Sequence, residues 1–261
     1  MLKGGQRIAT ATGVMLADPH CLGNAKKSAG ASLLDAGELL FGAGESLFDQ
    51  KYWSARGEFE QVSGGRGSAW FVGAAAHPLV LRHYRRGGFI ARLSQDRYWW
   101  MGEDRVRAFA EWRLLKYLTE RGLRVPKPVA AWYQRIGPTY RCDLITQRIA
   151  DTQSLSAALA HGPLPESTWR AVGAAIARLH KHGVDHADLN AHNILLDSKA
   201  VISVIDFDRG RLRRPGAWAS RNLRRLQRSL TKISVSLPPG RFTPAAWNQV
   251  LAGYQGEGQV G

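Results

Sequence analysis

The sequence predicts an α+β fold with two lobes: an antiparallel sheet that carries one main helix, then a short, mostly helical lobe. Short apolar runs bounded by Gly and Pro, such as residues 69–72 and 79–81, are typical of strands and fall in the first half of the chain. After Asp151 the apolar residues recur at helical spacing instead. With 261 residues, 44% of them hydrophobic, the chain has enough apolar material for one sizeable core or for two small lobes.

The first lobe is expected to contain a helix between strands. Apolar residues recur at helical spacing over residues 105–121, and this helix should end at Gly122, with Pro126 close behind. Residues 132–133 and 140–149 have the composition of further strands.

In the second lobe a helix is expected to begin at Pro165 and to stop at Gly183. A loop over residues 186–192 follows, and then two short apolar runs, 194–196 and 201–205, separated by a turn.

These patterns divide the chain into three parts. Residues 1–30 are rich in Gly, Ala, Ser, Thr and Lys without periodicity, which predicts a mobile N-terminal extension. The first lobe then covers residues 31–149, and the second lobe covers residues 150–261.

A basic amphipathic helix is predicted near the end of the chain. Residues 209–232 include nine basic side chains and no acidic one. Arginines recur at helical spacing on one face and aliphatic residues mark another: Arg221, Arg224, Arg225 and Arg228 against Leu223, Leu226, Leu230 and Ile233. Such a helix is either an ordinary solvated face or a surface seat for anionic lipid or substrate.

Charge and cysteine content narrow the class of protein. The formal net charge of +15 attracts nucleic acid, anionic lipid headgroups or phosphorylated substrates alike. Two cysteines provide neither a disulfide framework nor a paired thiolate metal site, so we expect a reducing compartment. No stretch approaches roughly 18 consecutive apolar residues, and the first 30 residues lack a signal-peptide pattern, so we expect the chain to stay where it is made.

One loop and the hairpin that follows it contain the residue types needed for catalysis. Asn193 and Asp206 offer hard oxygen ligands at the two ends of a short hairpin, which suits Mg²⁺ better than zinc. Asp188 is then available to accept a proton. Phosphoryl transfer needs this division of labour, in which a metal neutralises phosphate charge and one carboxylate orients the attacking hydroxyl.

The spacing His186-x-Asp188-x-x-x-x-Asn193, followed by Asp206-Phe207, resembles the catalytic and metal loops of the protein-kinase-like fold. The resemblance implies a bilobal kinase-like fold that uses ATP and Mg²⁺. It also implies Asp188 as the catalytic residue and Asn193 and Asp206 as the metal ligands.

The same resemblance implies a nucleotide site in the first lobe. Gly65 and Gly67 resemble the glycine-rich phosphate loop, although Trp70 replaces its third glycine. Adenine is expected to hydrogen-bond to the backbone from Gln147 to Ile149, in the linker between the lobes.

A departure from the family pattern occurs where the third strand normally carries a lysine. Arg82 stands there, and it can still contact phosphate oxygens although its planar group has a different geometry. Its expected acidic partner on the following helix is Glu111, with Glu103 and Glu120 as less favoured alternatives.

Two more departures lie in the second lobe. Asp208 replaces the glycine that usually follows Asp-Phe, and Asn190 replaces a phosphate-binding lysine of protein kinases. No Ala-Pro-Glu segment follows Asp206, so we expect a small-molecule acceptor rather than a protein substrate.

Three stretches are similar to the 3-deoxy-D-manno-octulosonic acid (Kdo) kinases of Gram-negative bacteria: residues 81–88, 96–99 and 186–196. The resemblance covers roughly residues 45–235. It implies ATP-dependent phosphorylation of the 4-hydroxyl of Kdo in a Kdo-lipid A precursor, in lipopolysaccharide core biosynthesis. It further implies a peripheral protein on the cytoplasmic side of the inner membrane. The expected partners are that acceptor and the anionic membrane surface, with no nucleic acid and no protein partner.

Two alternatives stay open. A kinase for another small acceptor, such as a heptose of the core or an aminoglycoside, shares the His-x-Asp loop. A basic membrane-binding pseudokinase is compatible with Arg82 and Asp208, but it has no need for Asp188, Asn193 and Asp206 together.

Overall fold

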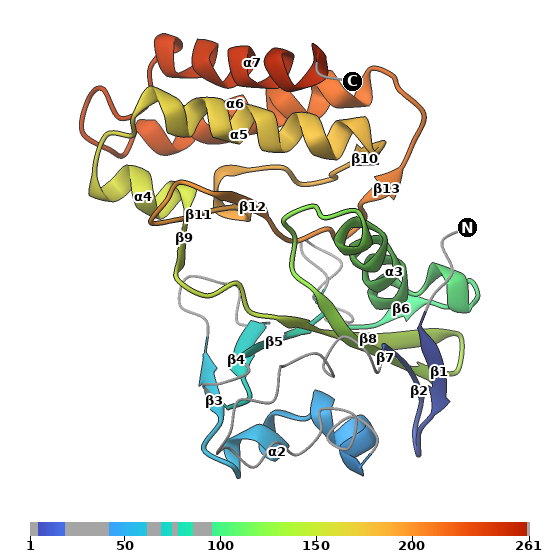
Figure 1. The fold of residues 1–261 in the computed structure, drawn as a ribbon. Coiled ribbons are helices and arrows are strands. Elements are labelled where there is room, and N and C mark those ends of the chain that lie inside the picture. The colour runs from blue at the N-terminus through green and yellow to red at the C-terminus, as the bar shows by residue number, and fades with distance from the viewer. Residues whose placement is uncertain (1–4, 19–41, 62–68, 75–77, 86–95, 260–261) are drawn as a thin grey trace. The chain divides into compact units, whose positions relative to one another are not determined.

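A computed structural model describes residues 5–18, 42–61, 69–74, 78–85 and 96–259 of the protein (Figure 1). It divides into two compact units. Unit 1 comprises Met1–Tyr117 and Pro126–Arg148, and unit 2 comprises Leu118–Val125 and Ile149–Gly261. Among the described helices, none combines the length and the apolar character needed to cross a bilayer.

Unit 1 is built on an antiparallel sheet. The strands follow the order β1-β2-β7-β8-β5-β4-β3, and β6 pairs with β8. Their bounds are β1 Gln6–Ala9, β2 Val14–Ala17, β3 Phe59–Gln61, β4 Ala69–Val72, β5 Leu79–His83, β6 Tyr98–Trp99, β7 Pro128–Ile136 and β8 Thr139–Gln147. The strands predicted over residues 69–72, 79–81, 132–133 and 140–149 are therefore confirmed, apart from the last residues of the fourth.

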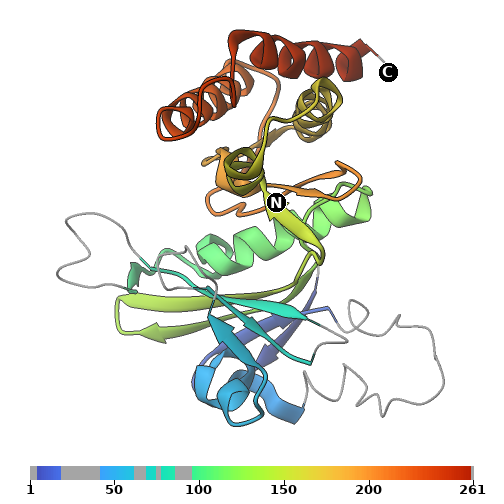
Figure 2. The ribbon, with the colours of Figure 1, turned by 90° about the vertical axis from the view of Figure 1, so that its left-hand side faces the viewer.

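Helices cover both faces of this sheet, as Figures 1 and 2 show, with α3 on one face and α2 on the other. The helical segments are η2 Gly44–Phe48, α2 Gln50–Ser54, η4 Glu103–Arg105 and α3 Arg107–Glu120. Trp53 of α2 is buried, and its indole N–H donates to the carbonyl oxygen of Leu47 at 2.7 Å. The helix predicted over residues 105–121 is confirmed as α3, and Gly122 follows it with a φ of +72°.

A hairpin near the N-terminus differs from the mobile extension expected over residues 1–30. Strands β1 and β2 pair with each other, and β2 continues the sheet by pairing with β7, with Leu16 opposite Ala131. Met15 is fully buried in the core. The strands have only four residues each, too few for a periodic pattern to emerge, and pairing with β7 stabilises them.

Unit 2 contains helices and two small sheets. The strand order is β12-β11-β9 in one sheet, and β10 pairs with β13 in the other. The elements are β9 Thr152–Ser154, α4 Leu155–His161, α5 Glu166–Lys181, β10 Val184–Asp185, η5 Ala191–Asn193, β11 Ile194–Asp197, β12 Ile202–Val204, β13 Arg211–Leu212, α6 Trp218–Ser234 and α7 Pro244–Gln259. The predicted helix before Gly183, the hairpin and the basic helix are confirmed as α5, β11–β12 and α6.

Helices α5 and α7 approach each other closely through two glycines. A Cβ at Gly173 of α5 would lie 1.9 Å from the backbone oxygen of Val250, and one at Gly253 of α7 would lie 2.0 Å from that of Arg170. The absence of side chains at these two positions therefore permits direct backbone contact.

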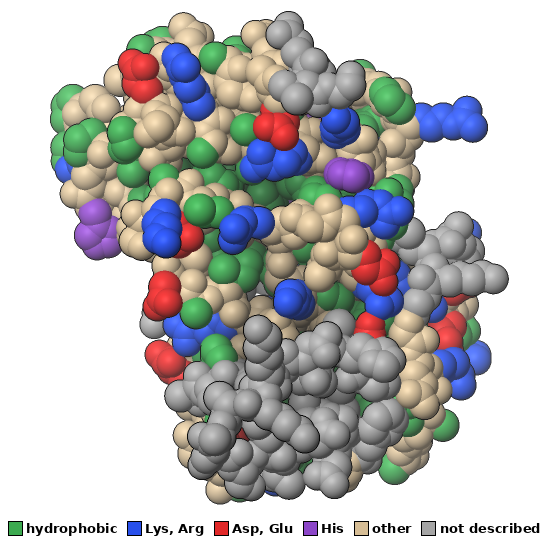
Figure 3. Space-filling model, in the orientation of Figure 1, with side chains coloured by type: hydrophobic (Ala, Val, Ile, Leu, Met, Phe, Trp, Pro, Cys, Tyr) green, Lys and Arg blue, Asp and Glu red, His purple; other side chains and the backbone are tan. Residues whose placement is uncertain are grey.

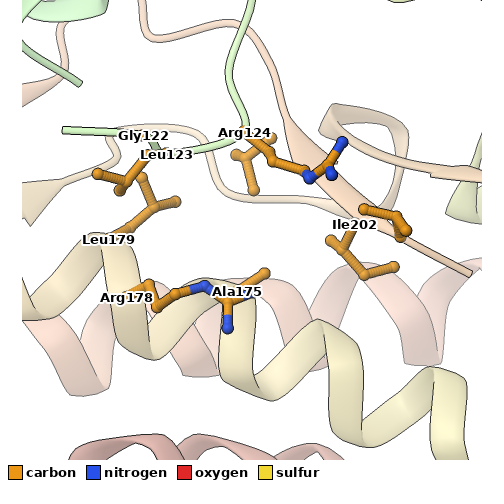
Figure 4. A pocket seen from close by; sticks show the side chains of 9 residues that line it. Gly122, Leu123, Arg124, Ala175, Arg178, Leu179 and Ile202 are labelled. Atoms are coloured by element: carbon orange, nitrogen blue, oxygen red, sulfur yellow. The ribbon is translucent and has the colours of Figure 1, made fainter. Parts of the chain in front are cut away.

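A pocket of about 190 Å³ in unit 2 lies between α5, β12 and the segment after α3. Figure 4 shows Arg124 and Arg178 among the side chains that line it, together with Leu179 and Ile202. Its lining includes no site residue predicted from the sequence, so the pocket does not mark the predicted chemistry.

Candidate active site

The catalytic loop begins where α5 ends. Gly183 adopts a φ of +73°, and a Cβ there would lie 2.6 Å from the carbonyl oxygen of Arg213. The backbone of Arg213 donates to the Gly183 carbonyl at 2.7 Å, and β10 then pairs with β13. These contacts hold the start of the loop in a defined position.

His186 braces this loop from inside. Its side chain is buried, its Nδ1 accepts the backbone N–H of Asp188 at 3.2 Å, and its Nε2 lies 3.0 Å from the carbonyl oxygen of Ile205. These bonds require Nε2 to carry the proton of a neutral ring, and burial lowers the pKa of His186, which favours that form. His186 thus connects the loop to the end of β12.

Asp188 and Asn193 lie at opposite ends of the same tight loop. The Asn193 side-chain amide donates to the Asp188 carbonyl at 2.9 Å, while the Asp188 side chain is 60% exposed. The Asn193 side chain is nearly buried, so its position is well defined. The Asp188 carboxylate is accessible to a substrate hydroxyl, as a general base requires.

Asp206 is brought to the same place by the hairpin. Ile194 pairs with Val204, and the backbone N–H of Ile205 donates to the Asn193 carbonyl at 2.9 Å, so Asp206 follows directly beside Asn193. Asp206 adopts a φ of +62°, a left-handed conformation that aspartate tolerates better than most residues. Phe207 is fully buried and its ring centroid lies 4.8 Å from that of His186, which anchors the segment.

The donor set fits a magnesium ion. Asn193 uses its amide nitrogen in the bond to Asp188, which leaves Oδ1 as the atom that can coordinate a cation. The Asp206 carboxylate supplies a second oxygen of the hard type that Mg²⁺ prefers. The two residues predicted as metal ligands are therefore brought together.

A buried network that the sequence analysis did not identify supports the loop. Asn222 of α6 accepts the backbone N–H of His186 at 3.0 Å and donates to Asp185 at 3.0 Å. Its Oδ1 also lies 3.3 Å from Nε2 of His180, whose pKa burial lowers to about 4. Burial alone would raise the pKa of Asp185, but hydrogen bonds from Arg213 and Asn222 outweigh it and hold that pKa below its ordinary value.

The departures at Asn190 and Asp208 have local explanations. The Asn190 side-chain oxygen accepts the backbone N–H groups of His192 and Asn193 at 2.8 and 3.2 Å, so it caps the turn that carries Asn193. Asp208 lies in a turn closed by the Gly210 N–H and the Phe207 carbonyl at 2.7 Å. Because Asp208 is not among the residues with positive φ, its backbone does not require glycine.

Unit 1 brings Arg82 and Glu111 together. Arg82 on β5 forms an ion pair with Glu111 on α3, whose side chain is only 3% exposed. The Tyr84 hydroxyl donates to the same carboxylate at 2.6 Å and accepts from Arg82 at 2.7 Å. Glu103, a less favoured partner, instead pairs with Arg7. Tyr84 was missed, although its place two residues after Arg82 puts it on the same face of the chain if the strand continues.

The remaining residues predicted for the nucleotide site are two glycines and the segment after β8. Gly65 and Gly67 lie outside the described residues. Gln147 ends β8, and its backbone N–H donates to the Lys127 carbonyl at 2.8 Å. Ile149 follows, and its carbonyl accepts the Thr152 hydroxyl at 3.0 Å. Adenine binding in this segment therefore has to use backbone groups other than the Gln147 N–H.

Comparison with known proteins adds independent information. The sequence model of the "Lipopolysaccharide kinase (Kdo/WaaP) family" matches residues 50–254. A 3-deoxy-D-manno-octulosonic acid kinase of Stenotrophomonas maltophilia is 48% identical over 206 residues, covering 78% of this chain and 81% of the relative. Proteins of the same name from Xylella fastidiosa and Xanthomonas euvesicatoria are 47% and 49% identical. The match to the Xylella protein covers 82% of this chain and 84% of the relative. The match to the Xanthomonas protein covers 78% of this chain and 81% of the relative.

The matched segment contains every site residue predicted from the sequence, and the resemblance inferred from three short stretches is confirmed. The chain belongs to the lipopolysaccharide kinase (Kdo/WaaP) family.

Proposed function

We propose that this chain is an ATP-dependent sugar kinase that transfers the γ-phosphate to the 4-hydroxyl of Kdo in a Kdo-lipid A precursor, in lipopolysaccharide core biosynthesis. The observation that carries the proposal is the loop that holds Asp188, Asn193 and Asp206 together. The name shared by relatives at 47–49% identity supports Kdo as the acceptor.

The site residues of unit 2 have separate roles in the proposed reaction. Asp188, whose carboxylate is exposed, orients the acceptor hydroxyl and accepts its proton. Asn193 and Asp206 hold Mg²⁺, which when bound neutralises the charge of the ATP phosphates. His186 is a positioning residue, because its buried ring bonds to the backbone of both Asp188 and Ile205.

In unit 1, Arg82 contacts the nucleotide phosphates, and Glu111 with Tyr84 orients its guanidinium group. Gly65 and Gly67, which lie outside the described residues, are assigned to the phosphates on their sequence pattern alone. The backbone between Gln147 and Ile149 binds adenine. Because Arg82 is always charged, its attraction for phosphate persists over the whole working pH range.

The acceptor carries a carboxylate and phosphates and is embedded in a membrane. A chain with a net charge of +15 is attracted to such a surface. We therefore place the protein peripherally on the cytoplasmic side of the inner membrane, with the acceptor and the anionic membrane surface as its partners.

The test is phosphate transfer from Mg²⁺-ATP to a Kdo-lipid A precursor, with heptose-bearing core as the competing acceptor. Asp188→Asn should lower kcat by about 10²–10⁴-fold because it removes the base but preserves the shape of the side chain. Asp104→Asn, which changes an exposed carboxylate of unit 1, is the matched control and should act like the wild type. NMR of the product identifies the phosphorylated hydroxyl.

Transfer to the heptose acceptor alone would leave a kinase but exclude Kdo as its substrate. ATP binding without transfer to either acceptor would favour the pseudokinase alternative.

A further inference from the structure

Arginines of α6 line a hollow of about 420 Å³ beside the catalytic loop. Its lining consists mainly of Arg221, Arg224, Arg225 and Arg228, with Asp185 and Ala187 from the loop side. We call this the arginine hollow. All four arginines are exposed, whereas Leu226 and Leu230 on another face of the same helix are buried. The hollow is therefore a consequence of the amphipathic pattern of α6.

Among the residues that the structure describes, the charge of the arginine hollow is largely uncompensated. Its one lining carboxylate, Asp185, already bonds to Arg213 and Asn222, both at 3.0 Å. Residues 209–232 contain no acidic side chain that could neutralise the rest. On the face drawn in Figure 3, basic and acidic side chains are interspersed.

The arginine hollow also touches the reacting end of the loop. Ala187 lines it, and the next residue is Asp188. Nη1 of Arg225 lies 3.5 Å from the Asp188 carboxylate, and both side chains are about half exposed. An exposed ion pair of this length contributes little to stability, so an incoming anion can replace it without a large penalty.

We propose that the arginine hollow binds the anionic groups of the acceptor, a sugar carboxylate or a phosphate ester, and so presents the acceptor hydroxyl to Asp188. The proposal rests on the proposed function and deepens it, because it assigns the acceptor side of the same site. A guanidinium group forms paired hydrogen bonds with either anion, and several of them fix orientation as well as charge. The nucleotide is assigned to other residues, so the hollow acts on the acceptor alone.

The experiment neutralises two arginines that do not touch Asp188. Arg224→Gln and Arg228→Gln, singly and together, are compared with Lys232→Gln, which removes an equal charge from the same helix but does not line the hollow. KM for the Kdo-lipid A precursor and for ATP is measured in neutral detergent, without phospholipid. The dissociation constant of the precursor is measured by calorimetry without ATP.

Each single variant should raise KM and the dissociation constant for the precursor by about tenfold, with KM for ATP and kcat changed less than about twofold. Lys232→Gln should act like the wild type. Repeating the measurements after phosphatase treatment of the precursor identifies the anion. If the effect of the variants persists, the bound anion is the Kdo carboxylate. If it disappears, the anion is a phosphate.

Equal effects of Lys232→Gln and Arg224→Gln, or an unchanged KM for the precursor, would overturn the proposal. If the double variant fails to fold, as judged by thermal unfolding, the effect on precursor binding is judged from the single variants and from Arg224→Lys. A wild type that binds the precursor through these arginines but transfers no phosphate would refute the proposed function and retain the hollow. Phosphate transfer that does not depend on the arginines would retain the proposed function and refute the role of the hollow.

Discussion

Replacing Asn222 by alanine should destabilise unit 2 and loosen the catalytic loop. The Asn222 side chain accepts the backbone N–H of His186 at 3.0 Å and donates to Asp185 at 3.0 Å. It is 4% exposed, so water is not expected to replace it readily in these bonds.

The loss of unfolding free energy can be estimated from the groups that lose their hydrogen-bond partner. A buried backbone N–H left without an acceptor costs about 1–3 kcal/mol. The hydrogen bond to Asp185 adds less, because that carboxylate keeps Arg213. We expect a total loss of about 2–4 kcal/mol of unfolding free energy, which corresponds to roughly 4–7 °C in the midpoint of thermal unfolding for a chain of this size.

Thermal unfolding measures this loss, and amide hydrogen exchange at His186 reports on the loop directly. Asn248→Ala, at an exposed position of α7, is the control and should stay within about 0.5 kcal/mol of the wild type. An Asn222→Ala variant with unchanged midpoint and unchanged protection of the His186 amide would refute the idea that this side chain holds the loop.

Three further predictions concern the rest of the fold. Arg82→Met removes the cation opposite the buried Glu111 and should cost about 2–3 kcal/mol in urea unfolding, whereas Arg82→Lys keeps the charge and should cost less. Gly173→Ala places a Cβ 1.9 Å from the α7 backbone and should cost about 2 kcal/mol or more. By contrast, Gly256→Ala meets open space and should stabilise the helix by about 0.5–1 kcal/mol. Burial lowers the pKa of His180 to about 4, so below pH ~6.5 the unfolded chain takes up a proton that the folded chain does not. Stability should therefore fall by up to about 1.4 kcal/mol per unit between pH ~6.5 and ~4, and His180→Gln should lack this part of the slope in pH-dependent unfolding.

Much of the catalytic loop could be predicted because its information is local. Asp188 and Asn193 belong to one short stretch, and a two-stranded hairpin has only one way to return Asp206 beside Asn193. The pairing of Arg82 with Glu111 was predicted from the resemblance to the kinase-like fold, which expects an acidic partner on the helix that follows the strand. Local spacing therefore accounts for the arrangement of the predicted site residues in this loop.

The supporting contacts could not be predicted in the same way. Asn222 lies 36 residues from His186, and the sequence shows only a polar residue on the mostly apolar side of α6. Helix α7 has weak amphipathic patterning, and at Gly253 it packs by close backbone approach rather than by a large side chain. The β1–β2 hairpin gains its stability from β7, more than a hundred residues away in the chain.

The departures from the kinase pattern coincide with local compensation. Asn190 caps the turn that carries Asn193, and the conformation of Asp208 lies outside the range that favours glycine. Arg82 keeps the acidic partner expected for the strand cation, and Tyr84 bonds to both members of the pair. Asn190 and Arg82 thus preserve the position of a neighbouring group, and Asp208 leaves the backbone of its turn unstrained. These substitutions therefore give no physical reason to expect an inactive kinase.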